Sequence, residues 1–193
     1  MTRRSRKTHS LLSIFTLLIG LSVFEYVEQG RVVWPSKLYY AARDIYGQMQ
    51  SQQAPAAEAG MAGWVSKVAD GDTFTLIAVG QAPRAVRLYG IDAPERDQAY
   101  GELATTALVA RIDGREVRVA VEDVDIYGRL VGTVFVNDSN INLAMVEQGH
   151  AWWYEQYARD AVELELAEQQ ARAARRGLWA SGTAVEPWEW RRR

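Results

Sequence analysis

The chain has 193 residues, enough for one domain with appendages to bury a core without covalent staples. It has no cysteine and two histidines, His9 and His150, which excludes disulfides and cysteine-based metal sites and nearly excludes a Ser-His-Asp triad. Any metal chemistry must therefore use carboxylates and hard cations such as Ca²⁺ or Mg²⁺. The formal net charge of −2 argues against a protein that coats nucleic acid non-specifically, because such proteins usually show a strong basic excess.

The N-terminus has the form of a secretory signal or a signal anchor. Residues 1–10 are basic and contain no acid, and residues 11–24 form an uncharged, mostly apolar run. No small-x-small cleavage site follows, so we expect residues 1–30 to be a signal-anchor helix rather than a cleaved signal peptide or a buried core helix. Its basic end would face the cytoplasm. The rest would be exported, anchored to the inner membrane, or secreted if the leader is cleaved.

The segments after the leader differ in composition. Residues 31–63 hold a short amphipathic helix at 36–50 and then a stretch rich in Ala, Gln, Gly and Pro, which is typical of a linker. We therefore expect the folded domain at residues 64–180, followed by a C-terminal tail at 181–193.

Within the expected domain, short β-rich runs alternate with turns. They predict strands at residues 64–68, 73–79, 84–91, 116–124 and 130–136. Apolar spacing predicts helices at 98–112, 140–148 and 159–176, the last with a Schellman-like stop at Gly177. Tight turns join the first three strands, which disfavours a parallel βαβ fold. The fold class is therefore α+β: a five-stranded OB-fold β-barrel with packed helices, preceded by the signal-anchor helix.

Three short segments hold residues of the kinds that catalysis uses. Residues 70–73 (DGDT) lead into the second strand, residues 87–95 (RLYGIDAPE) leave the third, and residues 125–129 (DIYGR) form a turn. Pro94 keeps Ala93 out of the helical region, so the loop can aim Asp92 and Glu95 at one place. Taken singly, the first segment is better explained as a hairpin turn and the third as a turn with an exposed arginine, and the second is equally well explained as a solvated loop.

Together the three segments supply what hydrolysis of a phosphodiester needs. Asp72 and Asp92, with a backbone carbonyl, suit a hard divalent cation. Glu95 is free to orient or deprotonate a water molecule. Arg87 and Arg129 can hold phosphate oxygens, and their hydrogen bonds strengthen as charge builds up in the transition state.

Two further motifs, NLAMVEQGHAW at 142–152 and ARAARRGLWA at 171–180, follow these segments in order. With DGDT, RLYGIDAPE and YGR they make residues 65–179 similar to the staphylococcal (thermo)nuclease family. The resemblance implies a Ca²⁺-dependent nuclease acting on DNA and/or RNA, with Mg²⁺ a less favoured cofactor. It implies an endonuclease that breaks the bond to the 5′ oxygen and leaves 3′-phosphates.

For the metal, the resemblance implies that Asp72 and Asp92 ligate Ca²⁺ by their carboxylates. Ala93 would contribute its backbone carbonyl, although the family prototype has threonine there, and a backbone ligand tolerates that change. Asp70 matches an acid in the second shell of the metal.

For the chemistry, the resemblance implies that Glu95 is the general base and that Arg87 and Arg129 bind the phosphate. Tyr154 and Tyr157 fall where the family places rings against a substrate base. For two neighbouring rings, Trp152 and Trp153, core packing and base stacking stay open, and His150 is expected to be a packing residue.

Other readings of the chain stay open. One is a non-catalytic nucleic-acid or protein-binding OB module tethered to the membrane, and another is an anchored member of an envelope complex whose cutting is incidental. We expect a monomer with a nucleic acid substrate and a membrane contact through residues 1–30. The tail at 187–193 (PWEWRRR) either docks on the domain through its tryptophans or lies loose and touches phosphate.

Overall fold

The computed structural model describes residues 60–193. The predicted signal anchor at 1–30, the amphipathic helix at 36–50 and most of the linker lie outside the described residues. Within residues 60–193, no helix is long and apolar enough to cross a membrane.

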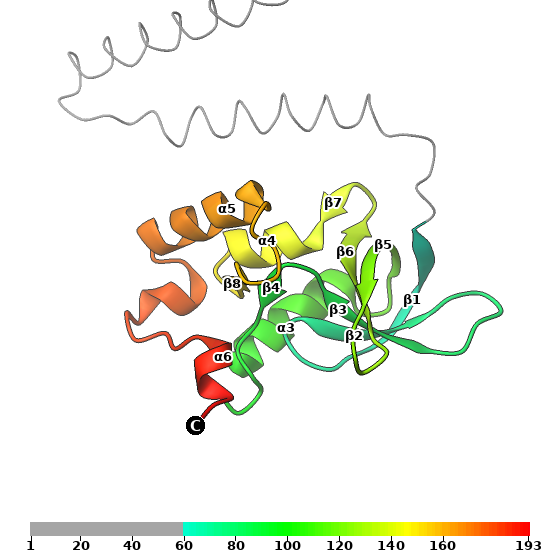
Figure 1. Cartoon of the computed structure of the whole chain (residues 1–193), viewed down its shortest axis with the longest axis horizontal. Coiled ribbons are helices and arrows are strands. Elements are labelled where there is room, and N and C mark those ends of the chain that lie inside the picture. The colour runs from blue at the N-terminus through cyan, green and yellow to red at the C-terminus, as the bar shows by residue number, and fades with distance from the viewer. Residues whose placement is uncertain (1–59) are drawn as a thin grey trace, which may run out of the picture. The chain divides into compact units, whose positions relative to one another are not determined.

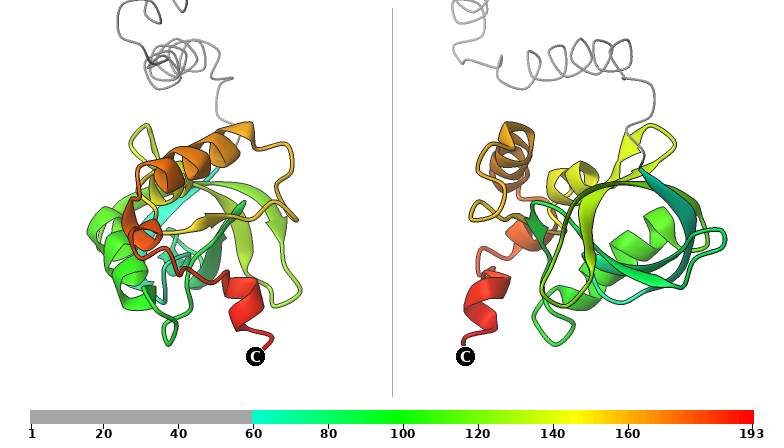
Figure 2. Two further views of the ribbon diagram at one scale, coloured as in Figure 1. Left: turned by 90° about the vertical axis from the view of Figure 1, so that its left-hand side faces the viewer. Right: turned by 45° about the vertical axis from the view of Figure 1, so that its right-hand side comes forward.

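Five strands close into a barrel, which confirms the expected five-stranded α+β barrel fold (Figure 1). The strands are β1 (Met61–Val68), β2 (Thr73–Ile77), β3 (Arg84–Leu88), β5 (Glu116–Val124) and β6 (Leu130–Val136). They follow the order β3-β2-β1-β5-β6 with antiparallel neighbours, and β3 pairs with β6 in parallel to complete the ring. The right-hand view of Figure 2 looks into this ring.

Alternation along the strands fills the barrel with apolar side chains. In β5, Val117 and Val119 are buried whereas their neighbours Glu116 and Arg118 are exposed, as expected for a strand with one face on the core. Helix α3 (Gly101–Ile112) packs Ala104, Leu108 and Ile112 into the same core. Among the apolar residues of these five strands, Phe74, Leu76, Val86, Val119 and Val134 are 0% exposed.

The remaining elements lie outside the ring. They are the short strands β4 (Ile91–Asp92), β7 (Ser139–Asn140) and β8 (Trp152–Trp153), the helices α4 (Ile141–Glu147), α5 (Val162–Ala173) and α6 (Pro187–Trp190), and the 3₁₀ helix η1 (Gly177–Ala180). Helix α5 lies beside α4 and buries Leu164, Ala167 and Ala171. Figure 1 shows α6 apart from α5, near β4 and α3.

Several predicted boundaries were wrong, among them the end of β2 and the starts of α3 and α5, and two of the differences have a clear physical cause. Strand β1 begins at Met61, three residues before the expected start at Trp64, because Met61, Ala62 and Gly63 pair with β5. The last helix was expected at 159–176 but α5 ends at Ala173. The Schellman-type stop falls two residues earlier than predicted, because Arg175 takes a positive φ of 52° and Arg176 N–H donates to the carbonyl of Ala171.

The strand predicted at 84–91 is divided into β3 and β4. Gly90 has a φ of 74°, which reverses the chain after β3 and sends Ile91 and Asp92 to pair with β8. A Cβ at Gly90 would lie 2.8 Å from Cδ1 of Leu164, so the turn also needs the missing side chain for close packing on α5. This break carries Asp92 away from the barrel strand that holds Arg87.

A buried asparagine, Asn142, ties this turn to the barrel. Its Oδ1 accepts from the N–H of Val134 at 3.0 Å, and its Nδ2 donates to the carbonyls of Tyr89 at 2.8 Å and Gly132 at 3.2 Å. Because Asn142 is fully buried, water cannot replace these bonds.

We expect Asn142→Ala to lower the free energy of unfolding by about 2–3 kcal/mol, because three backbone groups lose their partner. Chemical denaturation measures the change. The matched control is Gln148→Ala, at an exposed position whose side chain makes no hydrogen bond within residues 60–193. An Asn142→Ala protein as stable as the control would contradict this account.

His150 packs as expected rather than facing the candidate catalytic residues. Its ring stacks on Tyr100 at a centroid distance of 6.0 Å, and Nδ1 lies 3.0 Å from the Tyr100 hydroxyl. Burial, and then the positive charge of Arg111, lower the pKa of His150 to about 4. The folded protein therefore holds His150 neutral at pH values where the unfolded chain protonates it.

Because this pKa is lower in the folded state, the stability that it contributes is present above pH 6.5 and is lost as the pH falls towards 4. We expect the loss to be about 1–2 kcal/mol, since the ring is partly exposed and solvent screens it. His150→Gln should flatten that part of the pH profile of unfolding free energy, measured by denaturation at pH 7 and 4.5. A difference between wild type and His150→Gln that is the same at both pH values would refute the assignment.

Candidate active site

The guanidinium of Arg87 joins the two candidate cation ligands. Its Nη1 donates to Oδ1 of Asp72 at 2.7 Å and its Nη2 to Oδ1 of Asp92 at 2.8 Å. The Asp72 and Asp92 side chains are 5% and 0% exposed, and that of Arg87 is 18% exposed. The DGDT and RLYGIDAPE segments therefore meet at one buried charged cluster, which consists of Asp72, Arg87 and Asp92.

Local backbone geometry fixes Asp72. A Cβ at Gly71 would lie 2.7 Å from Cβ of Ala93, so only glycine lets the DGDT turn approach the loop after β4. The Asp72 carboxylate then accepts from the N–H of Ala93 at 2.9 Å and from the hydroxyl of Thr73 at 2.9 Å. Asp70 accepts from the N–H of Asp72 at 3.1 Å, which orients the turn from the other side.

The cluster carries more negative than positive charge. Burial, followed by the charge of Asp72, raises the pKa of Asp70 to about 6. Burial also raises the pKa of Asp92, although its bonds to two arginines act in the opposite direction. Burial by itself would lower the pKa of Arg87, but the charges of Asp72 and Asp92 raise it above its ordinary value. The repulsion between Asp70 and Asp72 and the raised pKa of Arg87 indicate a site that favours additional positive charge.

The donor atoms fit a hard divalent cation. Asp72 and Asp92 offer two carboxylates that are already bound by guanidinium cations, and the buried carbonyl oxygen of Ala93 accepts no hydrogen bond from any described residue. Across residues 60–193, no three acidic or histidine side chains lie close enough together to hold a metal ion. A cation here would therefore use two carboxylates and one carbonyl and keep several waters, as Mg²⁺ and Ca²⁺ commonly do.

Glu95 lies next to this cluster. One of its carboxylate oxygens accepts from Nη1 of Arg191 at 2.7 Å, and the same Nη1 is 3.2 Å from Oδ1 of Asp92. The Glu95 side chain is 35% exposed, so solvent reaches it. Its backbone N–H donates to Oε1 of Gln98 at 3.1 Å, which fixes the loop that follows β4.

Arg129 is not in contact with the acids of the cluster. Its Nε donates to Oδ2 of Asp125 at 2.7 Å, and its guanidinium lies 5.5 Å from the ring centre of Tyr127. The parallel register pairs Val86 with Leu130, so the residue before Leu130 lies on the same outer face of the barrel as Arg87. The fold thus puts Arg129 on the same outer face as Arg87, and Asp125 holds it within its own turn.

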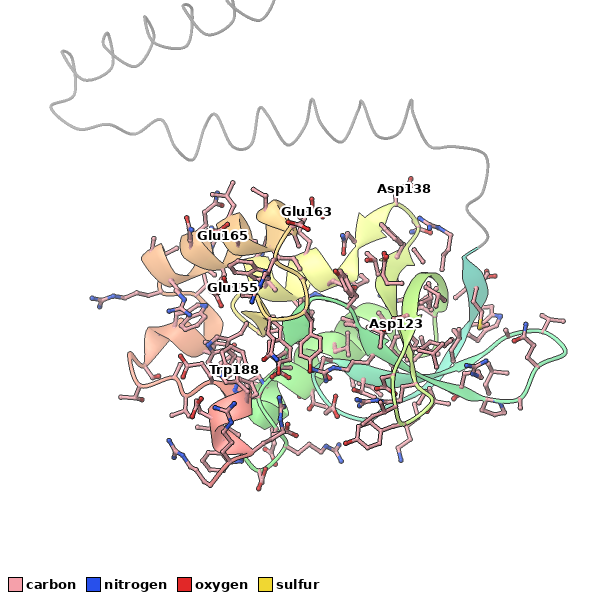
Figure 3. All side chains as sticks on the ribbon, viewed as in Figure 1. Asp123, Asp138, Glu155, Glu163, Glu165 and Trp188 are labelled. Atoms are coloured by element: carbon pink, nitrogen blue, oxygen red, sulfur yellow. The ribbon has the colours of Figure 1, made fainter. Side chains whose placement is uncertain are left out.

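Of the candidate stacking rings, Tyr154 lies at the cluster. Its N–H donates to the carbonyl of Gly90, and burial, followed by the negative charge of Asp92, raises its pKa. Tyr157 is 64% exposed and meets Tyr154 edge-on at 4.8 Å. The ring of Trp188 in α6 lies parallel to Tyr154 at 5.1 Å, and Figure 3 shows Trp188 between α6 and the β8 region.

The two open aromatic assignments resolve as packing. Trp152 is completely buried and meets Trp179 edge-on at 5.1 Å. Trp153 is partly buried and donates from Nε1 to the carbonyl of Ala158 at 2.9 Å. Trp152 is therefore a core residue, and Trp153 packs against the core from its edge.

Three residues at the site were not assigned a role from the sequence. Asp125 forms an ion pair with Arg129, and its position four residues earlier in the same turn could have indicated this pair. Arg191 and Trp188 come from the tail. Its two tryptophans suggested that the tail docks on the domain, but they did not indicate which surface it would contact. Of the two alternatives for the tail, docking is the one observed.

Comparison with known proteins agrees with this geometry. A family model described as staphylococcal nuclease homologue matches residues 85–181. Protein ParB of Escherichia coli is 46% identical over 149 residues, covering 72% of this chain and 84% of that protein. A protein named micrococcal nuclease from Shigella flexneri is 41% identical over 141 residues, covering 67% and 80%. The chain belongs to the staphylococcal nuclease family.

An uncharacterized endonuclease of Haemophilus influenzae is also similar, at 42% identity over 128 residues, covering 66% of this chain and 71% of that protein. The match to the staphylococcal nuclease model runs from β3 to just past η1 and includes Arg87, Asp92, Glu95 and Arg129. The C-terminal segment that holds Arg191 lies beyond it.

We expect Arg87→Ala to lower the free energy of unfolding by about 2–4 kcal/mol in the presence of a chelator, because two buried carboxylates lose their shared partner. Added Ca²⁺ should restore part of that loss by neutralising the same acids. Arg84→Ala is the matched control, since Arg84 lies on the same strand and forms no ion pair with any described residue. Equal stability of the two variants, measured by urea denaturation, would contradict the bridging role.

Proposed function

We propose that this member of the staphylococcal nuclease family is a calcium-dependent endonuclease that hydrolyses phosphodiester bonds of DNA and/or RNA and leaves 3′-phosphates. The observation that carries the proposal is the meeting of Asp72 and Asp92 at Arg87, with Arg191 joining Asp92 to the partly exposed Glu95. Nuclease relatives support the reaction class. The retained acids and arginines favour catalysis over a binding module without chemistry.

In this proposal, Glu95 holds a water molecule and takes its proton as the water attacks phosphorus in line with the 5′ oxygen. The bond from phosphorus to the 5′ oxygen breaks, and the leaving oxygen takes up a proton from solvent. Glu95 suits this role because solvent reaches its carboxylate while Gln98 fixes its backbone. Asp72, Asp92 and the carbonyl of Ala93 would hold Ca²⁺, with Asp70 orienting the Asp72 turn. When bound, the cation supplies positive charge that polarises the phosphate.

Arg87 and Arg129 would bind the phosphate from the outer face of the barrel. A guanidinium offers two parallel N–H donors to phosphate oxygens, and the bonds strengthen as negative charge grows in the transition state. A base of the substrate would stack on Tyr154 or Tyr157, which is worth about 1–3 kcal/mol per base. In this proposal the protein acts as a monomer.

We expect Glu95→Gln and Arg129→Ala each to lower turnover by about 10²–10³, because each removes a group that acts on the transition state. The assay is digestion of plasmid DNA and of RNA in Ca²⁺, with unfolding measured in parallel to show that both variants fold. If both variants retain a tenth of wild-type turnover, the assignment is wrong.

Two exposed residues provide matched controls. Glu163 on α5 is labelled in Figure 3 on the surface away from the tail helix, and Glu163→Gln makes the same chemical change as Glu95→Gln. Arg159→Ala makes the same change as Arg129→Ala at an exposed position. Both controls should keep wild-type turnover.

Chelation tests the proposed cofactor directly. A calcium chelator should abolish digestion, and excess Ca²⁺ should restore it, with Mg²⁺ restoring less. Treating the products with a phosphatase that acts on 3′ ends should release inorganic phosphate. Binding of nucleic acid without any cutting in Ca²⁺ would favour the alternative of a non-catalytic OB module.

We also propose, from the sequence of residues 1–30, that the domain is exported and tethered to the inner membrane. N-terminal sequencing of the protein recovered from a membrane fraction tests this. A released protein that begins after residue 30 would show cleavage of the leader.

A further inference from the structure

The C-terminal segment, residues 185–193, is seated beside the carboxylate cluster. Nε2 of Gln98 donates to the carbonyl of Val185 at 2.6 Å, and Nε1 of Trp190 lies 3.3 Å from Oδ1 of Asp97. Pro187 is buried at the first position of α6. In Figure 1 helix α6 lies beside α3 and the loop that follows β4. The segment is therefore packed against the loop that presents Glu95.

The segment covers the ring proposed to stack on the substrate. Trp188 lies parallel to Tyr154, with an angle of 3° between the rings and 5.1 Å between their centres. Such an offset stack buries one face of each ring. A nucleobase cannot stack on that face of Tyr154 while Trp188 occupies it.

The segment also occupies the proposed cation ligands. Nη2 of Arg191 donates to Oδ2 of Asp92 at 2.7 Å, and Nη1 contacts Oε1 of Glu95 at 2.7 Å and Oδ1 of Asp92 at 3.2 Å. Arg87 already holds Oδ1 of Asp92. Both oxygens of this carboxylate are therefore bound to guanidinium groups.

We propose that Arg191 competes with the divalent cation for Asp92, so that the C-terminal segment sets the cation affinity of the site and covers it when no cation is bound. The inference rests on the proposed function, because it takes Asp92 as a cation ligand and Glu95 as the residue that holds water. In the covered state the guanidinium takes the place of the cation and the indole of Trp188 takes the place of the base.

The two arginines on Asp92 differ in how freely they can leave. The Arg87 side chain is 18% exposed and lies on a barrel strand, whereas that of Arg191 is 39% exposed and follows a one-turn helix near the chain terminus. Release of Arg191 to solvent costs less, because its charge can be hydrated at once. A divalent cation that replaces Arg191 also neutralises the excess negative charge of the cluster.

Departure of Arg191 is linked to the rest of the segment through Gln98. This residue is 6% exposed, accepts from the N–H of Glu95 and donates to the carbonyl of Val185. The loop that carries Glu95 and the start of the segment therefore share one buried side chain. Cation binding at Asp92 and base stacking on Tyr154 both disfavour the covered state, so each should assist the other.

The test compares Ca²⁺ affinity in the full-length protein and two variants by isothermal titration calorimetry, without substrate. Arg191→Gln removes the competing guanidinium. Arg192→Gln is the matched control, because Arg192 has the same charge, is adjacent, and pairs with Glu189 on its own helix rather than with the cluster. If the open form makes up about a tenth of the wild-type molecules, Arg191→Gln should bind Ca²⁺ about tenfold more tightly. Arg192→Gln should stay near the wild-type value.

Hydrogen exchange supplies a second readout that does not depend on Arg191 substitution. Adding Ca²⁺ to the wild-type protein should speed exchange of the α6 amides of Trp190 and Arg191, which donate within the helix. Trp188→Ala should loosen the segment and tighten Ca²⁺ binding in the same direction as Arg191→Gln. Unfolding measurements on each variant verify that the barrel is intact.

The outcomes separate this inference from the proposed function. Tighter Ca²⁺ binding by Arg191→Gln but not by Arg192→Gln supports the inference. Equal Ca²⁺ affinity in wild type and both variants overturns it while leaving a calcium-dependent nuclease intact. Lower turnover of Arg191→Gln at unchanged Ca²⁺ affinity also overturns it, because Arg191 would then act on the substrate. No Ca²⁺ binding by any of the proteins overturns both the inference and the proposed cofactor.

Discussion

The bridge from Arg87 to Asp72 and Asp92 is the interaction on which the rest of the site depends. Two carboxylates with 5% and 0% exposed side chains would repel each other and lose hydration without a shared cation, and such a cost can exceed the stability gained elsewhere. The bridge requires the DGDT turn and the loop after β4 to approach within side-chain contact. Gly71 and Gly90 permit that approach, the first by lacking a side chain beside Ala93 and the second by its positive φ.

The same constraint explains the charge of the protein. A net charge of −2 argues against a protein that coats phosphates, yet the acids at the cluster are the ones proposed to bind a cation. A bound divalent ion inverts the local field, so acids near it favour a phosphate rather than repel it. Arg87 contacts these acids directly, and Arg129 lies on the same outer face of the barrel. Local arrangement and not total charge therefore suits this member of the staphylococcal nuclease family to a nucleic acid substrate.

The barrel positions the charged residues of the cluster. Parallel pairing of β3 with β6 closes the ring and brings Arg87 and Arg129 to one face, while Asn142 fastens the turn that follows β3 to the barrel. Beyond this frame, the C-terminal segment reaches Asp92 and Glu95 through the side chain of Arg191, and the buried side chain of Gln98 binds its Val185 carbonyl.

Local patterns in the sequence were sufficient for the strands, the three principal helices, the order of the motifs and the candidate residues, because alternation, turn residues and short motifs depend on neighbours along the chain. They misplaced the start of β1 and the end of α5, where pairing with β5 and the positive φ of Arg175 decide. Only the tertiary structure decided that β3 closes on β6, that Trp152 is core, and that Arg191 reaches Asp92 from 99 residues away. Contacts at such separations arise when the packed barrel brings distant segments together, and no local periodicity encodes them.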